Sequence, residues 1–302
     1  MICVGVDAGG TATQAALSKD GAFARESRGP GANATTLGID DAADVIIKTI
    51  RDVLHHEHPD AIYVGAAGAG RTRIAQGLRE LTAIAFPHAR IAVADDTAIA
   101  LRAAIPSGDG AVLIAGTGSV AYAEHGSRAQ RVGGLGYLAG DEGSAFWIGM
   151  QAVKLYGRVL DGRAARDETT DLVARALDAV DRASYLDALY EAPLHPASIA
   201  ALAPSIIAFA GKGNRASTKI VQQAAQELGD LVKAALKAVE IVDASPQLAL
   251  AGGLFAENSL LSFLLETRLT GDVAGLTIVR GGDSPVRGAL RLAERMIVAQ
   301  PT

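Results

Sequence analysis

The chain has 302 residues, of which 49% are hydrophobic and 20% charged, and its formal net charge is −5 at pH 7. This length suits two domains of ordinary size, whose cores need no disulfides or metal ions for stability. The single cysteine, Cys3, excludes a disulfide framework, an iron–sulfur cluster and a cysteine-rich zinc site within one chain. The acidic balance argues against a nucleic-acid surface, and no apolar run reaches transmembrane length, which argues against a membrane partner. The N-terminus lacks the pattern of a secretion signal, so we expect a cytoplasmic protein.

The first third of the chain predicts an α/β layer with a mixed sheet. Short apolar or alternating runs separated by glycine-containing turns predict the strands, and apolar residues at helical spacing predict the helices. The expected strands are 2–8, 12–17, 22–28, 61–67 and 90–94, and the expected helices are 39–55, 72–85 and 97–104. A three-stranded meander followed by alternating helices and strands is typical of such a layer.

A second unit is expected after the segment 106–110, which is rich in residues that break secondary structure. It opens with another strand–turn–strand pattern, and a glycine-rich stretch leads into a long helix over 144–159. The remaining expected elements are a mostly helical stretch over 167–242 with breaks at 191–196 and 211–214, strands at 248–251 and 276–279, a helix from Asn258 and a closing helix over 285–298.

Two similar glycine–threonine turns each follow an apolar strand. The first is Gly9-Gly10-Thr11, and the second is Gly116-Thr117-Gly118-Ser119. Because glycine has no Cβ, backbone N–H groups in such turns can approach a phosphate closely, and the Thr and Ser hydroxyls add further donors. Two hairpins of this kind predict two half-molecules that face one polyphosphate.

The order of the motifs resembles the actin/sugar kinase/heat-shock-70 ATPase superfamily. The motifs are Asp7-x-Gly9-Gly10-Thr11, Asp95-Asp96, Gly116-Thr117-Gly118-Ser119, Gly140-Asp141-Glu142-Gly143-Ser144 and Gly252-Gly253. Within the superfamily, the chain is most similar to the branch of N-acetylglucosamine kinases, glucosamine kinases and BadF/BadG/BcrA/BcrD-type ATPases. The resemblance spans nearly the whole chain, and the order of the motifs makes it specific.

This resemblance implies an α/β protein with two ribonuclease-H-like (actin-like ATPase) domains around a central cleft, each a mixed sheet with flanking helices. The N-terminal domain would comprise residues 1–106 plus 287–302 and carry the first phosphate loop and sugar contacts. The C-terminal domain, 107–286, would carry the second phosphate loop, the adenosine site and a helical insertion. The implied cofactors are ATP and Mg²⁺, and the implied partner is a small-molecule amino sugar.

The resemblance also assigns roles to carboxylates. Asp7 would hold Mg²⁺ through water, which suits a cation that keeps much of its hydration; the alternative is an Asp that stabilises the turn. Asp96 would be the general base that orients the sugar hydroxyl and takes its proton. Its neighbour Asp95 is expected to cap the following helix, although an adjacent pair of carboxylates can also divide catalytic and metal-binding roles.

Ligand contacts are implied for several small and amide residues. Asn33 matches an asparagine that contacts the sugar, with a turn residue of positive φ as the alternative. Gly68, Gly134 and Asp141 would lie against the sugar, although a tight turn explains Gly134 equally well. The expected nucleotide contacts are Gly9, Gly10, Thr11, Gly116, Thr117, Gly118 and Ser119 for the phosphates, and Gly252 and Gly253 for the adenosine.

The favoured function is an ATP-dependent kinase acting on the 6-hydroxyl of N-acetylglucosamine or glucosamine. The alternatives are a non-kinase ATP-binding conformational switch or activator, and a sugar-sensing ATPase. A switch needs no polar cluster for a sugar, so Asp96, Asn33 and Asp141 favour the kinase. No P-loop pattern is present, and one cysteine argues against activators that share an iron–sulfur cluster. N-acetylmuramic acid stays open as a substrate, as does a homodimer formed through 167–242.

Overall fold

The computed structural model describes residues 1–191, 195–241, 245–255 and 259–298. The chain divides into two compact units, one of which combines Met1–Gly108 with the C-terminal segment that begins at Arg280, while the other is Asp109–Val279. Among the described residues, no helix has both the length and the apolar character needed to cross a bilayer.

The chain returns to the first unit at Arg280, whereas the predicted domain boundary lies at position 287. Hydrogen bonds explain this difference. The Asp283 amide donates to the Ala103 carbonyl over 3.1 Å, and Arg291 donates to the Arg102 carbonyl over 3.0 Å and forms an ion pair with Asp283. The segment that precedes the last helix is therefore bonded to the first unit.

The first unit is built on a mixed sheet with the order β3-β2-β1-β4-β5. The meander strands β1, β2 and β3 pair in antiparallel fashion, whereas β4 and β5 extend the sheet from β1 in parallel. The strands are β1 (Ile2–Ala8), β2 (Ala12–Lys19), β3 (Ala22–Pro30), β4 (Ala61–Ala66) and β5 (Arg90–Asp95). The predicted mixed sheet is confirmed, with β2 and β3 each two residues longer than expected.

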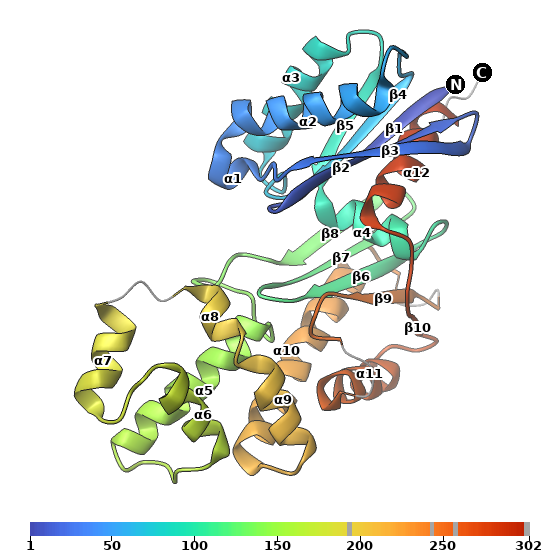
Figure 1. Cartoon of the computed structure of the whole chain (residues 1–302). Coiled ribbons are helices and arrows are strands. Elements are labelled where there is room, and N and C mark those ends of the chain that lie inside the picture. Colours follow the sequence, from blue (N-terminus) through green and yellow to red (C-terminus); the bar gives the residue numbers. More distant parts are fainter. Residues whose placement is uncertain (192–194, 242–244, 256–258, 299–302) are drawn as a thin grey trace. The chain divides into compact units, whose positions relative to one another are not determined.

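Helices cover both faces of this sheet (Figure 1). They are α1 (Ala34–Leu37), α2 (Ile39–Leu54), α3 (Thr72–Ala85), α4 (Asp96–Ala104) and α12 (Pro285–Val298). Val4 and Val6 of β1 pack with α2 and α3, while Cys3 packs with α12 on the opposite face, as the alternation of side chains along a strand requires. The short helix α1 was not expected from the sequence.

Two glycines allow α12 to approach its neighbours closely. A Cβ on Gly5 of β1 would lie 2.1 Å from the Leu290 backbone nitrogen, and a Cβ on Gly288 would lie 2.0 Å from the Ile99 carbonyl oxygen in α4. Both distances are far below van der Waals contact. Any side chain at either position would therefore displace the helix.

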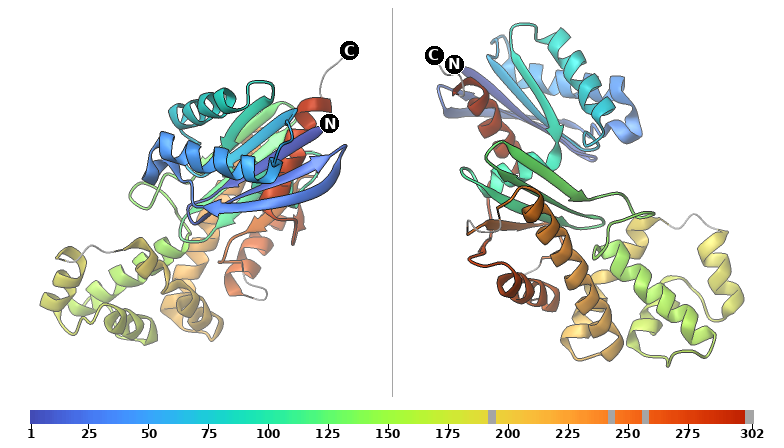
Figure 2. Two further views of the ribbon diagram at one scale, coloured as in Figure 1. Left: turned by 45° about the horizontal axis from the view of Figure 1, so that its top comes forward. Right: turned by 180° about the vertical axis from the view of Figure 1, so that it is seen from behind.

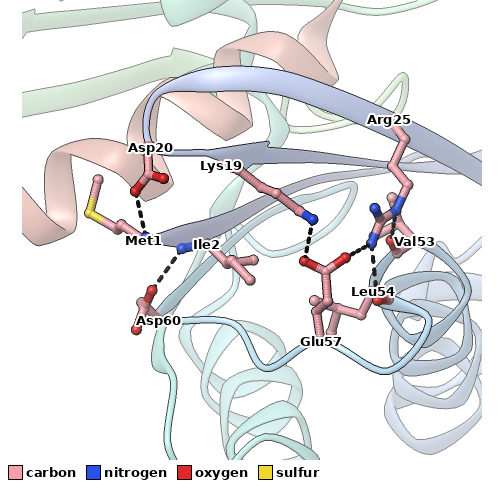
Figure 3. Close-up of polar contacts among 9 residues, drawn as sticks. All are labelled: Met1, Ile2, Lys19, Asp20, Arg25, Val53, Leu54, Glu57 and Asp60. Carbon is pink, nitrogen blue, oxygen red and sulfur yellow. Dashed lines mark hydrogen bonds and ion pairs between the residues drawn. The ribbon is translucent and has the colours of Figure 1, made fainter.

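Paired charges hold together what we call the amino edge of the first sheet, where β1 begins and β2 ends (Figure 3). Glu57 accepts hydrogen bonds from Lys19 and from Arg25, and Arg25 also donates to the Val53 carbonyl at the end of α2 over 2.6 Å. The Ile2 amide donates to Asp60 over 2.7 Å. These contacts fix the loop after α2 against the strands.

The second unit repeats the topology of the first, with the sheet order β10-β9-β6-β7-β8. Its strands are β6 (Gly110–Ala115), β7 (Ser119–His125), β8 (Arg128–Gly133), β9 (Gln247–Ala251) and β10 (Thr277–Val279). Again an antiparallel meander is extended by two parallel strands. The duplicated hairpin read from the sequence thus belongs to a duplicated sheet.

The long helix α10 packs across β6, β7 and β8 and lies between α11 and the group α5–α9 (Figure 2). The helices are α5 (Ala145–Leu160), α6 (Glu168–Ala176), α7 (Arg182–Tyr190), α8 (Pro196–Ala200), α9 (Ala203–Gly211), α10 (Arg215–Ala238) and α11 (Leu260–Asp272). The predicted helical stretch is confirmed within the described residues, with additional breaks between α6 and α7 and between α8 and α9. Residues 192–194 and 242 of that stretch lie outside the described residues, as does Asn258, the predicted start of α11.

Candidate functional site

The register of the first sheet brings several predicted residues to one edge. Ala8 of β1 pairs with Ala66 of β4, which in turn pairs with Asp95 of β5. The loops that follow these strands therefore begin side by side. Pro30, the last residue of β3, pairs with Ala12, so the loop that carries Asn33 starts at the same edge. We call this the carboxyl edge of the first sheet, because β1, β4 and β5 end there.

In the first glycine turn, some backbone groups form hydrogen bonds within the protein, and others remain available to a ligand. The Gly9 amide donates to the Ala12 carbonyl over 3.0 Å, and the Ala32 amide donates to the Gly9 carbonyl over 2.9 Å. A Cβ on Gly31 would lie 2.1 Å from the Gly10 oxygen, so only glycine permits this approach. Within the described part of the chain, no acceptor takes the amides of Gly10 or Thr11. Two backbone donors thus remain available for a ligand.

Asp7 is a half-buried carboxylate near the end of β1. Burial raises its pKa above the ordinary value, because it disfavours the charged form. No donor among the described residues hydrogen-bonds to it, and the same residues contain no group of three or more His, Cys, Asp or Glu side chains placed to hold a metal. A single unpaired carboxylate fits Mg²⁺ held through water, since this ion keeps several waters and takes other ligands from phosphates.

Asn33 caps helix α1 and lies close to Gly68. Its Oδ1 accepts a hydrogen bond from the Thr35 amide over 2.9 Å, and its φ is −73°, so the alternative of a turn residue with positive φ is wrong. A Cβ on Gly68, whose φ is +87°, would lie 2.4 Å from Thr35 Oγ1 and 3.4 Å from Asn33 Oδ1. In the regions that the structure describes, no acceptor bonds to Asn33 Nδ2, so this group can donate to a ligand.

The adjacent carboxylates Asp95 and Asp96 occupy different positions at the start of α4. Asp95 is the N-cap residue: its Oδ1 accepts from the Thr97 amide over 3.2 Å and from the Thr97 hydroxyl over 2.7 Å. This confirms the capping role expected for Asp95. Asp96 is the first residue of the helix and is half-buried at the carboxyl edge. Its role as general base stays a prediction.

The second glycine turn is held against the start of α5. The Gly116 amide donates to the Gly118 carbonyl over 2.9 Å, and the Ala145 amide donates to the Gly116 carbonyl over 2.9 Å. The Ser119 hydroxyl donates to the Glu142 carbonyl over 2.7 Å. The hydrogen bonds of the described residues leave the amide of Thr117 unused. As in the first unit, the turn is fixed while at least one donor remains free.

Asp141 lies directly beside this turn, whereas the sequence motif predicts for it a sugar contact alone. Its Oδ1 accepts from the Ser119 amide over 3.4 Å, and a Cβ on Gly118 would lie 2.8 Å from its Oδ2. Burial is the main reason why the pKa of Asp141 is raised, and hydrogen bonds from the Ser119 and Gly136 amides partly oppose it. Its backbone has a φ of +58°, which is uncommon outside glycine.

The three other glycine positions predicted in the second unit differ in what surrounds them. Gly134 has a φ of +63°, and its amide donates to the Ser119 carbonyl over 2.8 Å, so the tight-turn explanation holds for it. Gly252 has a φ of +101°, and a Cβ there would lie 2.3 Å from the Ala115 oxygen at the end of β6. A Cβ on Gly253 would meet no atom of the described residues within 4 Å, so this position leaves open space. The sugar and adenosine roles of these glycines stay predictions.

These features define a class of protein. Two α/β units share one strand order, and in each a glycine turn with free amides follows the first strand, which is the duplicated architecture of the actin-like sugar kinases. A crystal structure of a proposed N-acetylglucosamine kinase from Chromobacterium violaceum has this fold, with a TM-score of 0.71, 26% identity and coverage of 97% of this chain and 98% of that one. The chain belongs to the BadF/BadG/BcrA/BcrD ATPase family, whose model matches residues 4–293.

Two curated relatives are named as kinases of amino sugars. The N-acetylmuramic acid/N-acetylglucosamine kinase of Clostridium acetobutylicum is 32% identical over 202 residues, which cover 66% of this chain and 65% of the relative. The N-acetyl-D-glucosamine kinase of Dictyostelium discoideum is 23% identical over 311 residues, which cover 97% of both chains. The match thus spans 65% of the first relative and nearly the whole of the second. Relatives of this kind do not favour a non-kinase switch.

Proposed function

We propose that the chain is an ATP-dependent kinase that phosphorylates the 6-hydroxyl of an amino sugar, N-acetylglucosamine or glucosamine. The observation that carries this proposal is the convergence at the carboxyl edge of the first sheet. This edge carries the carboxylates of Asp7 and Asp96, the amide of Asn33 and the backbone amides of Gly10 and Thr11, which have no acceptor among the described residues. Donors for phosphate, a ligand for a cation and polar groups for a sugar are the parts that such a transfer needs.

Each unit carries groups that suit part of a nucleotide. In the first unit, the amides of Gly10 and Thr11 would donate to phosphate. In the second unit, the Thr117 amide would donate to phosphate, and the open backbone at Gly253 would accommodate part of the adenosine. Asp7 would hold Mg²⁺ through water, and the ion would neutralise negative charge on the phosphates. Because backbone donors in these turns are already fixed by the surrounding hydrogen bonds, they need little reorganisation when the nucleotide binds.

Asp96 would act on the acceptor sugar. Its carboxylate accepts a hydrogen bond from the 6-hydroxyl, orients the oxygen towards the γ-phosphorus and takes the proton as the new O–P bond forms and ADP departs. Asn33 Nδ2 donates to another hydroxyl of the sugar, which fixes its orientation. Asp95 is occupied as a helix cap, and its role is to hold the start of α4 in place.

Asp141 would contact a sugar hydroxyl, and it lies beside the second turn. It contacts Ser119 and lies next to Gly118, so a sugar hydroxyl bonded to its carboxylate would lie close to the turn that binds phosphate. We also propose a homodimer that forms through residues 167–242, and a cytoplasmic location for the protein. The mass of the protein in solution tests the first of these.

The decisive experiment is ADP release from Mg·ATP by the purified full chain. The panel contains N-acetylglucosamine, glucosamine, N-acetylmuramic acid, N-acetylmannosamine, glucose and no sugar. We expect turnover with one or more of the first three sugars and the phosphate on oxygen 6, as judged by NMR of the product. Hydrolysis that does not depend on sugar would indicate the switch or sensing ATPase, and no turnover with any sugar would overturn the kinase assignment.

A further inference from the structure

The helical part of the second unit contains a groove of about 700 Å³. It lies between α5, the segment that leads into α6, and the first turns of α10. Its lining residues are Gln151, Lys154, Leu155, Arg158, Ala164, Ala165, Asp167, Arg215, Ala216, Lys219, Ile220 and Gln223. We call it the basic groove. It shares no residue with the candidate kinase site.

Four cationic side chains line the basic groove: Lys154 and Arg158 on α5, and Arg215 and Lys219 on α10. Among the residues that the structure describes, none of the four forms an ion pair. Two nearby arginines, Arg163 and Arg182, by contrast both form ion pairs with Asp161. Four cations in one groove without an ion-pair partner in the described part of the chain are unusual for a protein with a net charge of −5.

The positions of these cations are unfavourable for folding. Lys154 and Arg158 are four residues apart on one helix, as are Arg215 and Lys219 on the other, and like charges at this spacing repel each other. Arg215 is also the first residue of α10, where the helix dipole disfavours a positive charge. A bound anion would relieve both effects.

Of the described residues that line the groove, one is a carboxylate, and it forms no ion pair with any of the four cations. Asp167 caps α6 by accepting from the Thr170 amide over 3.1 Å, and its other oxygen accepts from Asn214 Nδ2 over 3.3 Å. Asn214 in turn caps α10, and a buried hydrogen bond of 2.7 Å between Thr169 and Ser217 lies between the two helix ends. This network fixes the N-terminal ends of α6 and α10 side by side, so the groove has a rigid base.

We propose that the basic groove binds a phosphorylated small molecule, a phosphate monoester or diphosphate with at least two negative charges. Lys and Arg are the side chains that bind phosphate most strongly, and the volume lies in the range of small-molecule sites. Leu155 and Ile220 provide apolar contact for the part of the ligand that carries no charge. The proposal does not depend on the kinase assignment.

The test is equilibrium binding of N-acetylglucosamine 6-phosphate, glucose 6-phosphate and inorganic pyrophosphate to the full chain, measured by calorimetry with Mg·ADP at saturation. The groove variant is the double substitution R158E and K219E. The matched control is R175E and K237E, which changes the same residue types at exposed positions of α6 and α10 outside the groove. We expect the groove variant to bind at least about tenfold more weakly and the control to bind like the wild type.

Thermal unfolding supplies a second readout that needs no ligand. The groove variant removes two like-charge pairs, so its Tm is expected to exceed that of the control, which also shows that it folds. Selective loss of sugar phosphate binding identifies a phosphate ester as the ligand, and selective loss of pyrophosphate binding identifies a diphosphate. The proposal is overturned if no probe binds the wild type, or if the groove variant binds every probe as tightly as the control.

Discussion

At the amino edge of the first sheet, the charged groups of Lys19, Arg25 and Glu57 are paired with one another (Figure 3). At the carboxyl edge, the carboxylate of Asp7 and the Nδ2 group of Asn33 have no partner among the described residues. The same strands run from one edge to the other. The backbone fold alone therefore does not explain why polar groups are paired at one edge and left for a ligand at the other. Paired groups stabilise the folded chain, whereas polar groups left unpaired reduce its stability and are available to a ligand. The difference indicates which edge serves stability and which serves binding.

The strongest test of this comparison is Asp96→Asn. Asparagine has nearly the same shape but cannot take a proton, so sugar-dependent ADP release should fall by about 10²- to 10⁴-fold. The Tm should change little, because Asp95 still caps α4. Activity is measured with the sugar that the wild type prefers, and unfolding by circular dichroism.

The neighbouring substitution Asp95→Asn is the matched control. Asparagine caps helices about as well as aspartate, so both the Tm and the activity should stay near wild-type values. An Asp95→Asn enzyme as inactive as Asp96→Asn would show that the two carboxylates share the catalytic or metal-binding work.

A smaller loss is expected for Asp7→Asn, about 10- to 100-fold in activity, because Asp7 is proposed to hold Mg²⁺ through water. The same substitution should not lower the stability of the folded chain and should tend to raise it. Burial raises the pKa of Asp7 in the folded chain. Between the ordinary and the raised value, the folded chain therefore binds more protons than the unfolded chain, and stability falls as the pH increases.

Asparagine has no charge to bury, so at neutral pH the Tm of Asp7→Asn should equal or exceed that of the wild type. The difference should disappear at acid pH, below the ordinary pKa of aspartate. A clear loss of stability at neutral pH would mean that the Asp7 carboxylate has a structural role, and the contrast between the two edges would not hold there.

Gly68→Ala tests the carboxyl edge by geometry instead of charge. The new methyl group would collide with Thr35 and displace the loop that carries Asn33, so KM for the sugar should rise several-fold while KM for ATP changes less. Gly21→Ala, in the turn at the amino edge, is matched to it, since both glycines have a positive φ but Gly21 has open space around it.

Gly21→Ala should reduce stability by about 1 kcal/mol, the usual strain of a left-handed residue other than glycine, and Gly68→Ala by at least as much because of its collision with Thr35. Only Gly68→Ala should alter the kinetics. Equal kinetic effects from the two variants would show that the sugar loop does not depend on the space at Gly68.

The smallest effect is expected for Glu57→Gln at the amino edge, where activity should not change. Hydrogen bonds from Lys19 and Arg25 lower the pKa of Glu57 in the folded chain. Its contribution to stability is therefore present above the unfolded pKa and is lost as the pH falls through the folded pKa. The Tm of the variant should be slightly below that of the wild type at neutral pH, and the gap should close in acid. A loss of sugar-dependent activity would contradict the assignment of this edge to stability.

Local signals explain why most of the fold could be predicted from the sequence. Alternation along β1 and helical spacing along α3 operate within a few residues, and glycine turns mark where strands end. Helix α1 was missed because its four residues are too few to show a period. The capping role of Asp95 was predictable for the same reason, since its partner Thr97 is two residues away.

Contacts between distant segments explain what could not be predicted. Asp141 touches Ser119, which is 22 residues earlier in the chain, and no local pattern indicates that approach. The basic groove arises only when α5 packs against α10, because its four cations are dispersed in the sequence. The steric need for glycine at positions 5 and 288 likewise depends on helix α12 returning to the first sheet.

The contribution of α12 to the first unit also orders events during protein synthesis. Residues 109–279 are contiguous, so the ribosome has made every part of the second core before α12 emerges. One face of β1, by contrast, must wait for Val286 and Leu290 before it is covered. The N-terminal sheet is thus translated first but completed last, and the apolar surface around Cys3 and Ala16 lacks its α12 cover for most of translation.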